Sequence, residues 1–364
     1  MNLHSLLRKE ISEYDIEMLN VKAADAFILR YKYEGEEKYH IVLVDAGNVC
    51  DGDNILNHIR KYNANPVIDL AIVSHPDKDH FGGFIPLLKH IKSNDGNGIA
   101  INKFWINDPQ NSHIDVDDVK YVRTQKGVNE RAASIWDHSG DNLIQLIQDC
   151  KIPAIEKFAD TKIIIRKDTS TISTIPVDSF DEFPGCTIIG PTRNYFDELA
   201  PNMRYDNMVM FSEKSENDED DEEFVVTDDC LSASLDNAAD DASAHNQSSL
   251  IFLWEPKAGE KFLFMGDASY ASFKNLKPIH KRLVKNVSWL KVPHHGSMHN
   301  LNSEMIKHFS PKTAYISTEK RGHYLSQCTV NALKNAGVDV YSTHFENSNI
   351  LRGHREGYSL AKKL

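Results

Sequence analysis

The 364-residue chain contains 41% apolar residues, enough for a sizeable core, and its formal net charge at pH 7 is −12. This charge is concentrated in one place: residues 213–241 hold thirteen acidic side chains against the single Lys214. The rest of the chain carries 40 acidic and 40 basic residues. The net charge of the body therefore neither supports nor excludes a polyanionic substrate.

Two broad classes of protein are disfavoured by the sequence. Charges occur throughout the first twenty residues, and no apolar run in the chain approaches the ~20 residues of a membrane span. We therefore expect a soluble, cytoplasmic protein. The five cysteines are an odd number, lie far apart and form no C-x-x-C pair, which argues against a disulfide framework and a cysteine-rich zinc site.

Strands are predicted where apolar and β-branched residues cluster, and helices where apolar residues recur at helical spacing. In the first part of the chain these patterns predict strands over 18–30 and 40–44, a helix over 54–62, a strand over 67–74 and a helix over 81–91. The region 93–185 shows no recognisable chemistry and is treated as variable, with predicted strands over 102–107 and 162–166 and a helix over 131–150.

The second part of the chain has a regular pattern, interrupted by the acidic stretch. Because residues of about 213–245 combine low hydrophobicity with charge of one sign, we expect a disordered insertion within a single domain. The predicted strands are 186–190, 250–254, 261–265, 288–292, 314–317, 338–343 and 358–360, and the predicted helices are 302–308 and 329–336. Strand clusters near both ends, each followed by helices, predict an α/β sandwich of two packed β-sheets flanked by helices.

Four potential metal ligands, His75, Asp77, Asp79 and His80, directly follow the predicted strand 67–74. Such crowding of charge is costly in a core unless a divalent cation compensates it. A tight turn can direct His75 and Asp77 to one metal and Asp79 and His80 to a second. The alternative is a capped, solvated loop, but the glycines at 82 and 83 allow the close backbone approach that a crowded site needs.

Two later strands also end in residues that bind metals. The strand at 262–265 is followed by Gly266 and Asp267, and Asp267 could bridge two cations, although aspartates are common in turns. The strand at 289–292 is followed by the rarer pair His294 and His295. Because adjacent side chains on an extended segment diverge, we expect one of these histidines to be a ligand and the other to support a ligand or face the substrate.

In this order, the motifs resemble those of the metallo-β-lactamase superfamily, specifically the hydrolase domain of the competence protein ComEC and its stand-alone soluble relatives. The motifs of that branch resemble S-H-P-D-x-D-H-x-G-G, N-x-S-x-L, G-D and H-H-G-S. The corresponding segments are 74–83, with the glycines one place early, 246–250, 266–267 and 294–297. The implied fold is the αβ/βα sandwich of that superfamily over the whole chain.

Two departures from the branch bear on the substrate more than on the metals. Its G-Q-G-D motif is here Lys22-Ala23-Ala24-Asp25, in which only the aspartate remains. Its late V-G-x-x-N-x-Y-G-H-P motif corresponds to 318–324, which keeps a glycine and His323 but lacks the asparagine and the proline.

The resemblance implies two divalent ions, zinc or manganese with magnesium as an alternative, which lower the pKa of an attacking water. Asp77 occupies a position that is histidine in many superfamily members, which makes manganese or magnesium plausible beside zinc. The implied metal ligands are His75, Asp77, Asp79, His80, Asp267, His294 and His295.

The resemblance also implies catalytic and supporting roles. Asp79, Asp267 and His323 are the implied catalytic residues, with Asp267 holding both metals and His323 protonating a leaving group or contacting phosphate. Asp25 and Asp45 are expected to support the ligands, with turn capping as the alternative.

Four residues are predicted to contact or attract a substrate. Lys78 and Lys291 could supply positive charge. Gly296 and Ser297, expected to open the next helix, could offer backbone N–H groups to a phosphate oxygen. The alternative for each is a surface or packing residue.

Three functions stay open. The first is a phosphodiesterase, a nuclease acting on DNA or RNA, for which the basic cluster at 274–285 could bind the backbone unless it is simply a solvated helix face. The second is hydrolysis of a smaller phosphoester of the cyclic nucleotide or phosphorylcholine type. The third is a partner-regulated subunit in which the acidic stretch docks a basic protein, since stand-alone relatives often belong to multi-gene systems, including antiviral defence. If this stretch is only an insertion, deleting 213–245 leaves folding and metal content intact.

Overall fold

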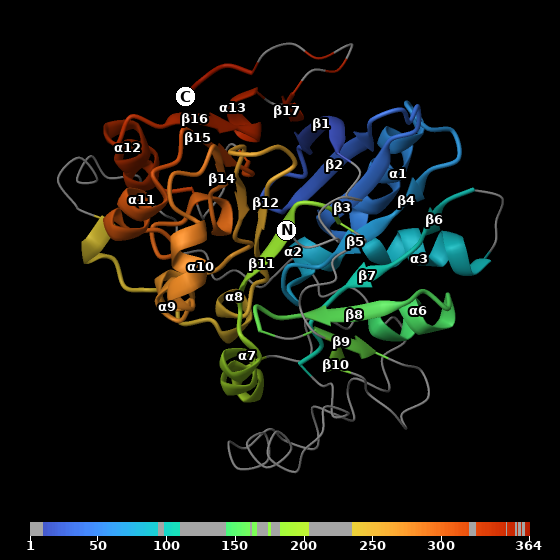
Figure 1. Ribbon diagram of the computed structural model, residues 1–364, viewed down its shortest axis with the longest axis horizontal. Coiled ribbons are helices and arrows are strands. Elements are labelled where there is room, and N and C mark those ends of the chain that lie inside the picture. The colour runs from blue at the N-terminus through green and yellow to red at the C-terminus, as the bar shows by residue number, and fades with distance from the viewer. Residues whose placement is uncertain are drawn as a thin grey trace, which may run out of the picture.

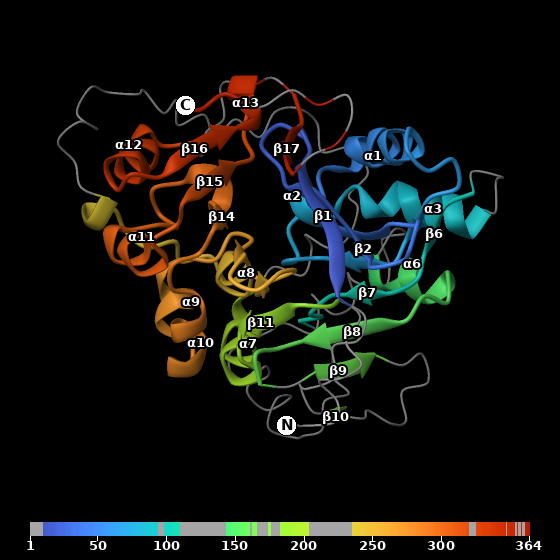
Figure 2. The same cartoon turned by 45° about the horizontal axis from the view of Figure 1, so that its top comes forward.

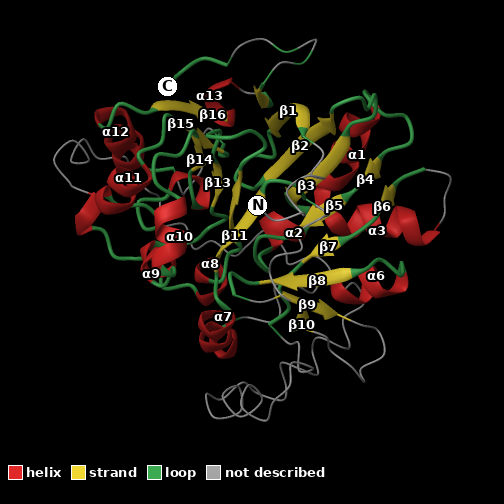
Figure 3. Ribbon diagram, in the orientation of Figure 1, coloured by secondary structure: helices red, strands yellow, loops and turns green. Residues whose placement is uncertain are grey.

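A computed structural model of the chain shows two β-sheets packed face to face with helices on both outer faces (Figures 1 and 3). It describes residues 10–93, 98–109, 143–160, 162–165, 174–175, 183–203, 235–319, 325–346, 348–353, 355, 358 and 361–364. The predicted αβ/βα sandwich is therefore confirmed.

The first sheet has nine strands in the order β10-β9-β8-β7-β5-β3-β2-β1-β17. The strands are β1 (Ile11–Met18), β2 (Ala26–Tyr33), β3 (His40–Ala46), β5 (Leu70–Ile72), β7 (Phe104–Trp105), β8 (Ala154–Lys157), β9 (Lys162–Ile165), β10 (Thr174–Ile175) and β17 (Ile350–Arg352). The late strand β17 pairs with β1 at the edge (Figure 2). Strands β3, β5, β7 and β8 are parallel, so their carboxyl ends share one edge of the sheet.

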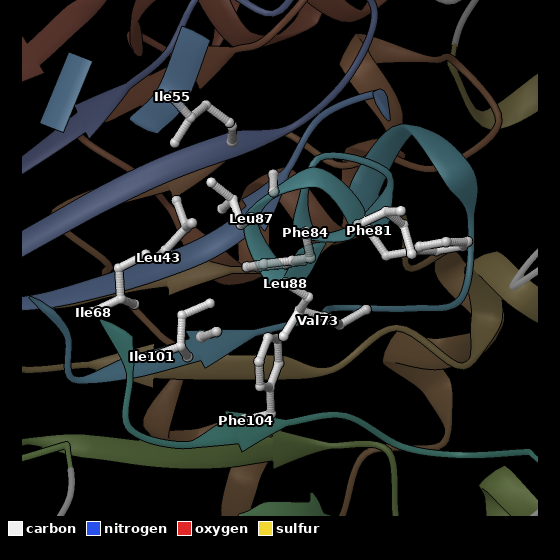
Figure 4. Close-up of a cluster of buried hydrophobic side chains, with 14 of the residues drawn as sticks. Leu43, Ile55, Ile68, Val73, Phe81, Phe84, Leu87, Leu88, Ile101 and Phe104 are labelled. Atoms are coloured by element: carbon white, nitrogen blue, oxygen red, sulfur yellow. The ribbon is translucent and has the colours of Figure 1, made fainter. Parts of the chain in front are cut away.

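Three helices cover the outer face of this sheet, namely α1 (Gly52–Arg60), α3 (Phe84–Ser93) and α6 (Leu143–Asp149). Their apolar faces share one core with the strands, in which Phe84, Leu87 and Leu88 of α3 lie against Leu43 and Phe104 (Figure 4). The short pair β4 (Val67–Ile68) and β6 (Ala100–Ile101) forms a separate small sheet.

The second sheet has six strands, in the order β11-β12-β13-β14-β15-β16. They are β11 (Cys186–Gly190), β12 (Ile251–Trp254), β13 (Phe262–Phe264), β14 (Trp289–Lys291), β15 (Thr313–Ile316) and β16 (Asp339–Ser342). The outer face is covered by α9 (Tyr270–Lys274), α10 (Pro278–Leu283), α11 (Ser303–Phe309) and α12 (Gln327–Asn335). The remaining helices are α2 (Lys78–Phe81), α7 (Arg193–Leu199), α8 (Ala244–Gln247) and α13 (Thr343–Glu346). No helix among the described residues is both long and apolar enough to span a bilayer.

Aromatic side chains fill the space between the two sheets. Phe252 and Phe264 stack with ring centroids 4.6 Å apart, and Phe27 of the opposite sheet meets Phe264 edge-on at 5.7 Å. Trp289 completes this group at 4.9 Å from Phe264. Full burial of such side chains stabilises the fold by roughly 1.5–3 kcal/mol each. This aromatic layer therefore stabilises the packing of one sheet on the other.

Two predicted strands are in fact interrupted. The strand predicted at 18–30 is two strands joined by a loop, because Lys22 adopts a left-handed φ of 64° and Leu19 N–H closes onto Ala26 O at 2.9 Å. The run at 67–74 splits at Asp69, whose carboxylate accepts a hydrogen bond from Ile41 N–H at 2.9 Å. Within the described residues, a helix occurs near the position of each predicted helix. The strand β17, in contrast, was not predicted.

The C-terminal part of the predicted insertion is folded. Residues 235–245 contain a 3-10 turn, and Ser243 caps α8. Asp236 accepts a hydrogen bond from Ser303 N–H at the start of α11, and Asp240 accepts from the first two N–H groups of α9. The boundary at 245 was therefore wrong, because aspartates that cap helices belong to the fold despite their acidic neighbours. Residues 213–234 lie outside the described residues.

A buried ion cluster ties the C-terminal region to the first sheet. The Arg355 guanidinium donates to Asp15 and Glu17 of β1, at 2.6 Å in each case, and Arg30 donates to Asp15 at 2.5 Å. His58 lies 2.7 Å from Glu17. Burial opposes ionisation of Glu17, but the hydrogen bond from His58 and the charge of Arg355 lower its pKa.

Replacing Arg355 with methionine is expected to destabilise the protein at pH 7. The change leaves Asp15 and Glu17 short of positive charge, at a cost of about 2–4 kcal/mol, less than for a fully buried pair because the Arg355 side chain is still 10% exposed. The difference in unfolding free energy from the wild type should shrink below pH ~4.3, where the carboxylates take up protons. Urea unfolding measures both effects. The exposed pair Lys363–Asp339 supplies the control, and K363M should unfold like the wild type.

Candidate metal centre

The predicted ligands lie where strands of both sheets end. Strand β5 leads into Ser74 and His75, and α2 then carries Asp79 and His80 at the centre of the molecule in Figure 1. From the second sheet, β13 leads to Asp267 and β14 leads to the pair at 294–295. The fold thus brings together three segments that are far apart in sequence, as the motifs predicted.

One carboxylate oxygen lies at the middle of the site. Four imidazole nitrogens surround Oδ2 of Asp267: the Nε2 atoms of His80 at 3.2 Å, His294 at 3.8 Å, and His75 and His295 at 3.9 Å. The other oxygen, Oδ1, accepts hydrogen bonds from the backbone N–H of His294 at 3.1 Å and from a lysine at 3.2 Å. Asp267 therefore presents a single oxygen to the histidines.

Two further carboxylates stand beside these histidines. Oδ2 of Asp77 lies 3.4 Å from His75 Nε2. Oδ2 of Asp79 lies 3.2 Å from His295 Nε2 and 3.7 Å from His80 Nε2. Both aspartates are half-buried, whereas Asp267 is buried.

This donor set fits divalent cations. The ligand atoms of His75, His80 and Asp267 lie within 4.8 Å of one another, as do those of Asp79, His80 and His295. Nε2 of His75 is buried and has no hydrogen-bond partner among the described residues. Since buried polar atoms are normally satisfied, a group absent from the chain accounts best for this nitrogen.

The pKa values of the buried carboxylate and the histidines also indicate that the site requires positive charge. Burial would raise the pKa of Asp267, but the charges of His80, Lys291 and His294 hold it well below its usual value. Burial would lower the pKa of His80, yet Asp267, Asp79 and Asp45 keep it well above the usual value, and mainly Asp267 raises that of His294 to about 9 against its burial. Without metal, protons on His80 and His294 therefore compensate the carboxylates, and a bound ion would displace them.

His80 is oriented by Asp45, one of the predicted supports. Oδ2 of Asp45 lies 2.9 Å from His80 Nδ1, which directs Nε2 toward Asp267. The same aspartate accepts hydrogen bonds from Ser74 N–H and Ser74 Oγ, both at 2.7 Å, and Ser74 Oγ lies 3.0 Å from His75 Nδ1. Asp45 thus fixes the turn that carries the first two histidines.

His294 and His295 approach Asp267 together, which corrects the expectation that they diverge. Both residues have left-handed backbone, with φ of 47° and 52°, so the segment is a tight turn and not an extended strand. His295 Nδ1 is held by Ser317 O at 3.1 Å, and His294 Nδ1 by Asn300 Oδ1 at 2.9 Å. Each nitrogen so held leaves Nε2 facing the centre of the site.

Lys291 is an internal cation and cannot contact a substrate. It is 1% exposed, and its ammonium donates to Gly266 O at 2.7 Å, contacts Asp267 Oδ1 at 3.2 Å and pairs with Asp25. Burial opposes its charge, but Asp25 and Asp267 raise its pKa. The expected positive charge of Lys291 is therefore directed to buried carboxylates and not to a substrate, because Lys291 sits on the inward face of β14. Asp25 acts as a support through this pair.

Of the other residues predicted at the substrate, Gly296 and Ser297 are not available and Lys78 is exposed. The N–H groups of Gly296 and Ser297 already donate to carbonyls of the same turn, at 3.1 and 2.9 Å, and the next helix begins only at Ser303. They are therefore unavailable to a phosphate, contrary to expectation. Lys78 is exposed at the first position of α2. His323 lies outside the described residues.

Three residues at the site were missed in the sequence. His245 is buried, and its Nδ1 lies 2.8 Å from Asp77 Oδ1. Asp241 and Asn300 flank His294 Nδ1, at 3.3 and 2.9 Å. The N-x-S-x-L motif that follows His245 was the available signal for this segment, whereas Asp241 was hidden within the acidic stretch.

Comparisons with known proteins identify relatives of part of the chain. No family model matches it. ComE operon protein 3 of Bacillus subtilis (strain 168) is 32% identical over 111 residues, which span 30% of this chain and only 14% of that protein. The resemblance to a ComE protein that the motifs suggested is thereby confirmed over this part of the chain.

Two solved structures are also similar, each with a TM-score of 0.40. Igni18, described as a novel metallo hydrolase from the hyperthermophilic archaeon Ignicoccus hospitalis KIN4/I, is 10% identical, with 94% of this chain and 100% of that chain covered. A diphosphatase from the PhnP family is 8% identical, with 96% of this chain and 99% of that chain covered.

Replacing Lys291 with methionine is expected to destabilise the metal-free protein by about 3–5 kcal/mol, because two buried carboxylates lose their shared cation. Urea unfolding in the presence of a chelator measures this loss. K291R, which keeps the charge, should recover part of it, and K78M, at an exposed position, should match the wild type. Equal stability of K291M and K78M would show that Lys291 does not hold the site together.

Proposed function

We propose that the chain is a metal-dependent hydrolase, a two-metal phosphodiesterase that acts on DNA or RNA through one sandwich domain. The observation that carries this proposal is the position of Asp267 Oδ2, with four imidazole nitrogens within 3.9 Å. A shared carboxylate oxygen among histidines is the arrangement that a pair of bridged cations requires.

The ligands divide into two groups around this shared carboxylate. One ion would be held by His75, Asp77 and His294, the second by Asp79, His80 and His295, and both by Asp267. Each group then offers two imidazoles and one carboxylate of its own. Because imidazole suits zinc and carboxylate suits manganese, this mixed ligand set makes zinc or manganese the expected metal.

A count of charges favours two ions over one. Among the described residues, the centre holds a single internal ammonium, that of Lys291. Six carboxylates lie around the histidines, those of Asp25, Asp45, Asp77, Asp79, Asp241 and Asp267. When the histidines are neutral, two divalent cations together with this ammonium leave one negative charge uncompensated, whereas one divalent cation leaves three.

When bound, the two ions supply Lewis-acid activation of a water molecule and of a phosphoryl oxygen. The chain's own residues hold the geometry: Asp45 orients His80, and Lys291 occupies the oxygen of Asp267 that faces away from the histidines. Lys78, exposed beside Asp77, is positioned to meet a phosphate. A proton for the leaving group is assigned to His323 from the resemblance alone.

A nucleic-acid substrate is favoured by the resemblance to the ComE protein and by a basic surface on α9 and α10. Lys274, Lys277, Arg282 and Lys285 are exposed there, and Lys277 pairs weakly with Asp160 at 3.6 Å. Exposed cations on adjacent helices can follow a phosphodiester backbone. Docking of a protein partner on the acidic stretch is a separate proposal and does not alter the chemistry.

The test combines metal analysis with hydrolysis assays. Purified protein should contain two divalent ions per chain and cleave linear DNA, plasmid or RNA as well as a chromogenic phosphate bis-ester. The variants D79A and D267A should lose activity by more than the roughly 10–100-fold that loss of an outer partner costs. Undiminished hydrolysis in both variants, or a wild-type protein without metal, would show that the chain is not a metal-dependent hydrolase using this site.

The same assays separate the two substrate classes. Charge reversal at the basic surface, R282E with K285E, should slow cleavage of nucleic acid and flatten its salt dependence but leave bis-ester cleavage unchanged. K363E provides a single charge reversal at another exposed position as a control. Hydrolysis of cyclic dinucleotides or the bis-ester alone, with nucleic acids intact, would point to the smaller phosphoester instead.

A further inference from the structure

The two proposed ligand groups are supported from different parts of the fold. His80 and His295 are held by the two sheets, through Asp45 at the end of β3 and the backbone carbonyl of Ser317 just after β15. Asp45 is 2% exposed and Ser317 is 0% exposed. The support for this group therefore belongs to the packed interior.

The other group is supported by one short segment, residues 241–246. His245 Nδ1 lies 2.8 Å from Oδ1 of Asp77. Asp241 Oδ2 lies 3.3 Å from His294 Nδ1, and Asn246 Nδ2 lies 3.5 Å from the same nitrogen. Asp77 and His294 belong to different strand ends, yet the same six residues contact both.

This segment is rigidly fixed. Asp241 accepts hydrogen bonds from Ser243 N–H at 2.8 Å, Asn246 Nδ2 at 2.6 Å and Asn300 Nδ2 at 2.8 Å. Asn300 Nδ2 also donates to the backbone carbonyl of Asp267 at 2.8 Å. The segment is thus linked, through Asn300, to the backbone of Asp267 as well as to two ligands of one group.

We infer that residues 241–246 form a bracket that sets the metal affinity of the position held by His75, Asp77 and His294, and not that of the other position. The inference rests on the proposed function, because it assumes two bound ions. In this bracket, Asp241 of the acidic stretch and His245, which is not one of the predicted ligands, are positioning residues of one half of the centre.

The bracket acts on metal affinity through the ligand atoms that face away from the metal position. A hydrogen bond from His294 Nδ1 to Asp241 or Asn300 fixes the ring so that the lone pair of Nε2 points to the centre. A hydrogen bond from His245 occupies Oδ1 of Asp77 and leaves Oδ2 toward His75. Outer partners of this kind are typically worth 10–100-fold in metal affinity.

The test is a cobalt(II) titration of the full chain, followed by absorption spectroscopy and by competition with a chelator. Wild-type protein should bind two ions. D241A and H245L should bind one ion with wild-type affinity and the second about 10–100-fold more weakly. H245N, whose amide nitrogen can reach the position of Nδ1, should restore much of the second affinity.

Two variants serve as matched controls. D240A removes a neighbouring aspartate that caps α9, and it should bind both ions like the wild type. D45N should weaken the opposite position more than the position of His75, because Asp45 contacts His80 directly and His75 only through Ser74 Oγ. The bracket inference is wrong if H245L lowers the cobalt affinity of both positions equally, or if neither D241A nor H245L lowers the affinity of either position. A wild type that binds fewer than two ions instead overturns the proposed function, and the bracket falls with it.

Discussion

The metal centre is organised around one buried carboxylate, that of Asp267, which lies between the ends of the two sheets. A buried carboxylate requires compensation, and Asp267 receives it from both sides. Lys291 and a backbone N–H occupy one oxygen, and four imidazoles surround the other. The oxygen that faces the histidines is the point at which both sheets contribute to a common site.

This convergence needs backbones that approach one another closely. Gly266 precedes Asp267 with a φ of 52°, and a Cβ there would lie 2.9 Å from Ser249 Oγ and 3.1 Å from Ser74 Cβ. Across the site, a Cβ on Gly83 would lie 2.0 Å from the Ala46 carbonyl oxygen. The glycines that accompany the motifs therefore bring the strand ends together, and side chains at these positions would push the ligand turns apart.

The sequence predicted what is local at the site and failed where partners are distant. The ligands were predictable because His75, Asp267 and His294 directly follow apolar strands. The turn at His294 and His295 was not, because nothing in P-H-H-G reveals two left-handed residues in succession. Lys291 looked like a surface charge, since its partner Asp25 lies 266 positions earlier in the chain. Asp241 resembled its acidic neighbours, although Asn300 and His294 enclose it.

These differences also bear on how metal binding relates to folding. The aromatic layer between the sheets contains no metal ligand, so the sandwich has a core of its own. Ligands that bind only the native state still stabilise it, by about 2.7 kcal/mol at a concentration 100 times the Kd. Because Asp45 and Ser317 are buried in the sheets whereas residues 241–246 follow the acidic stretch, the two halves of the centre depend on different parts of the chain. Local loosening near residue 241 would therefore weaken one metal position and leave both the other position and the core intact.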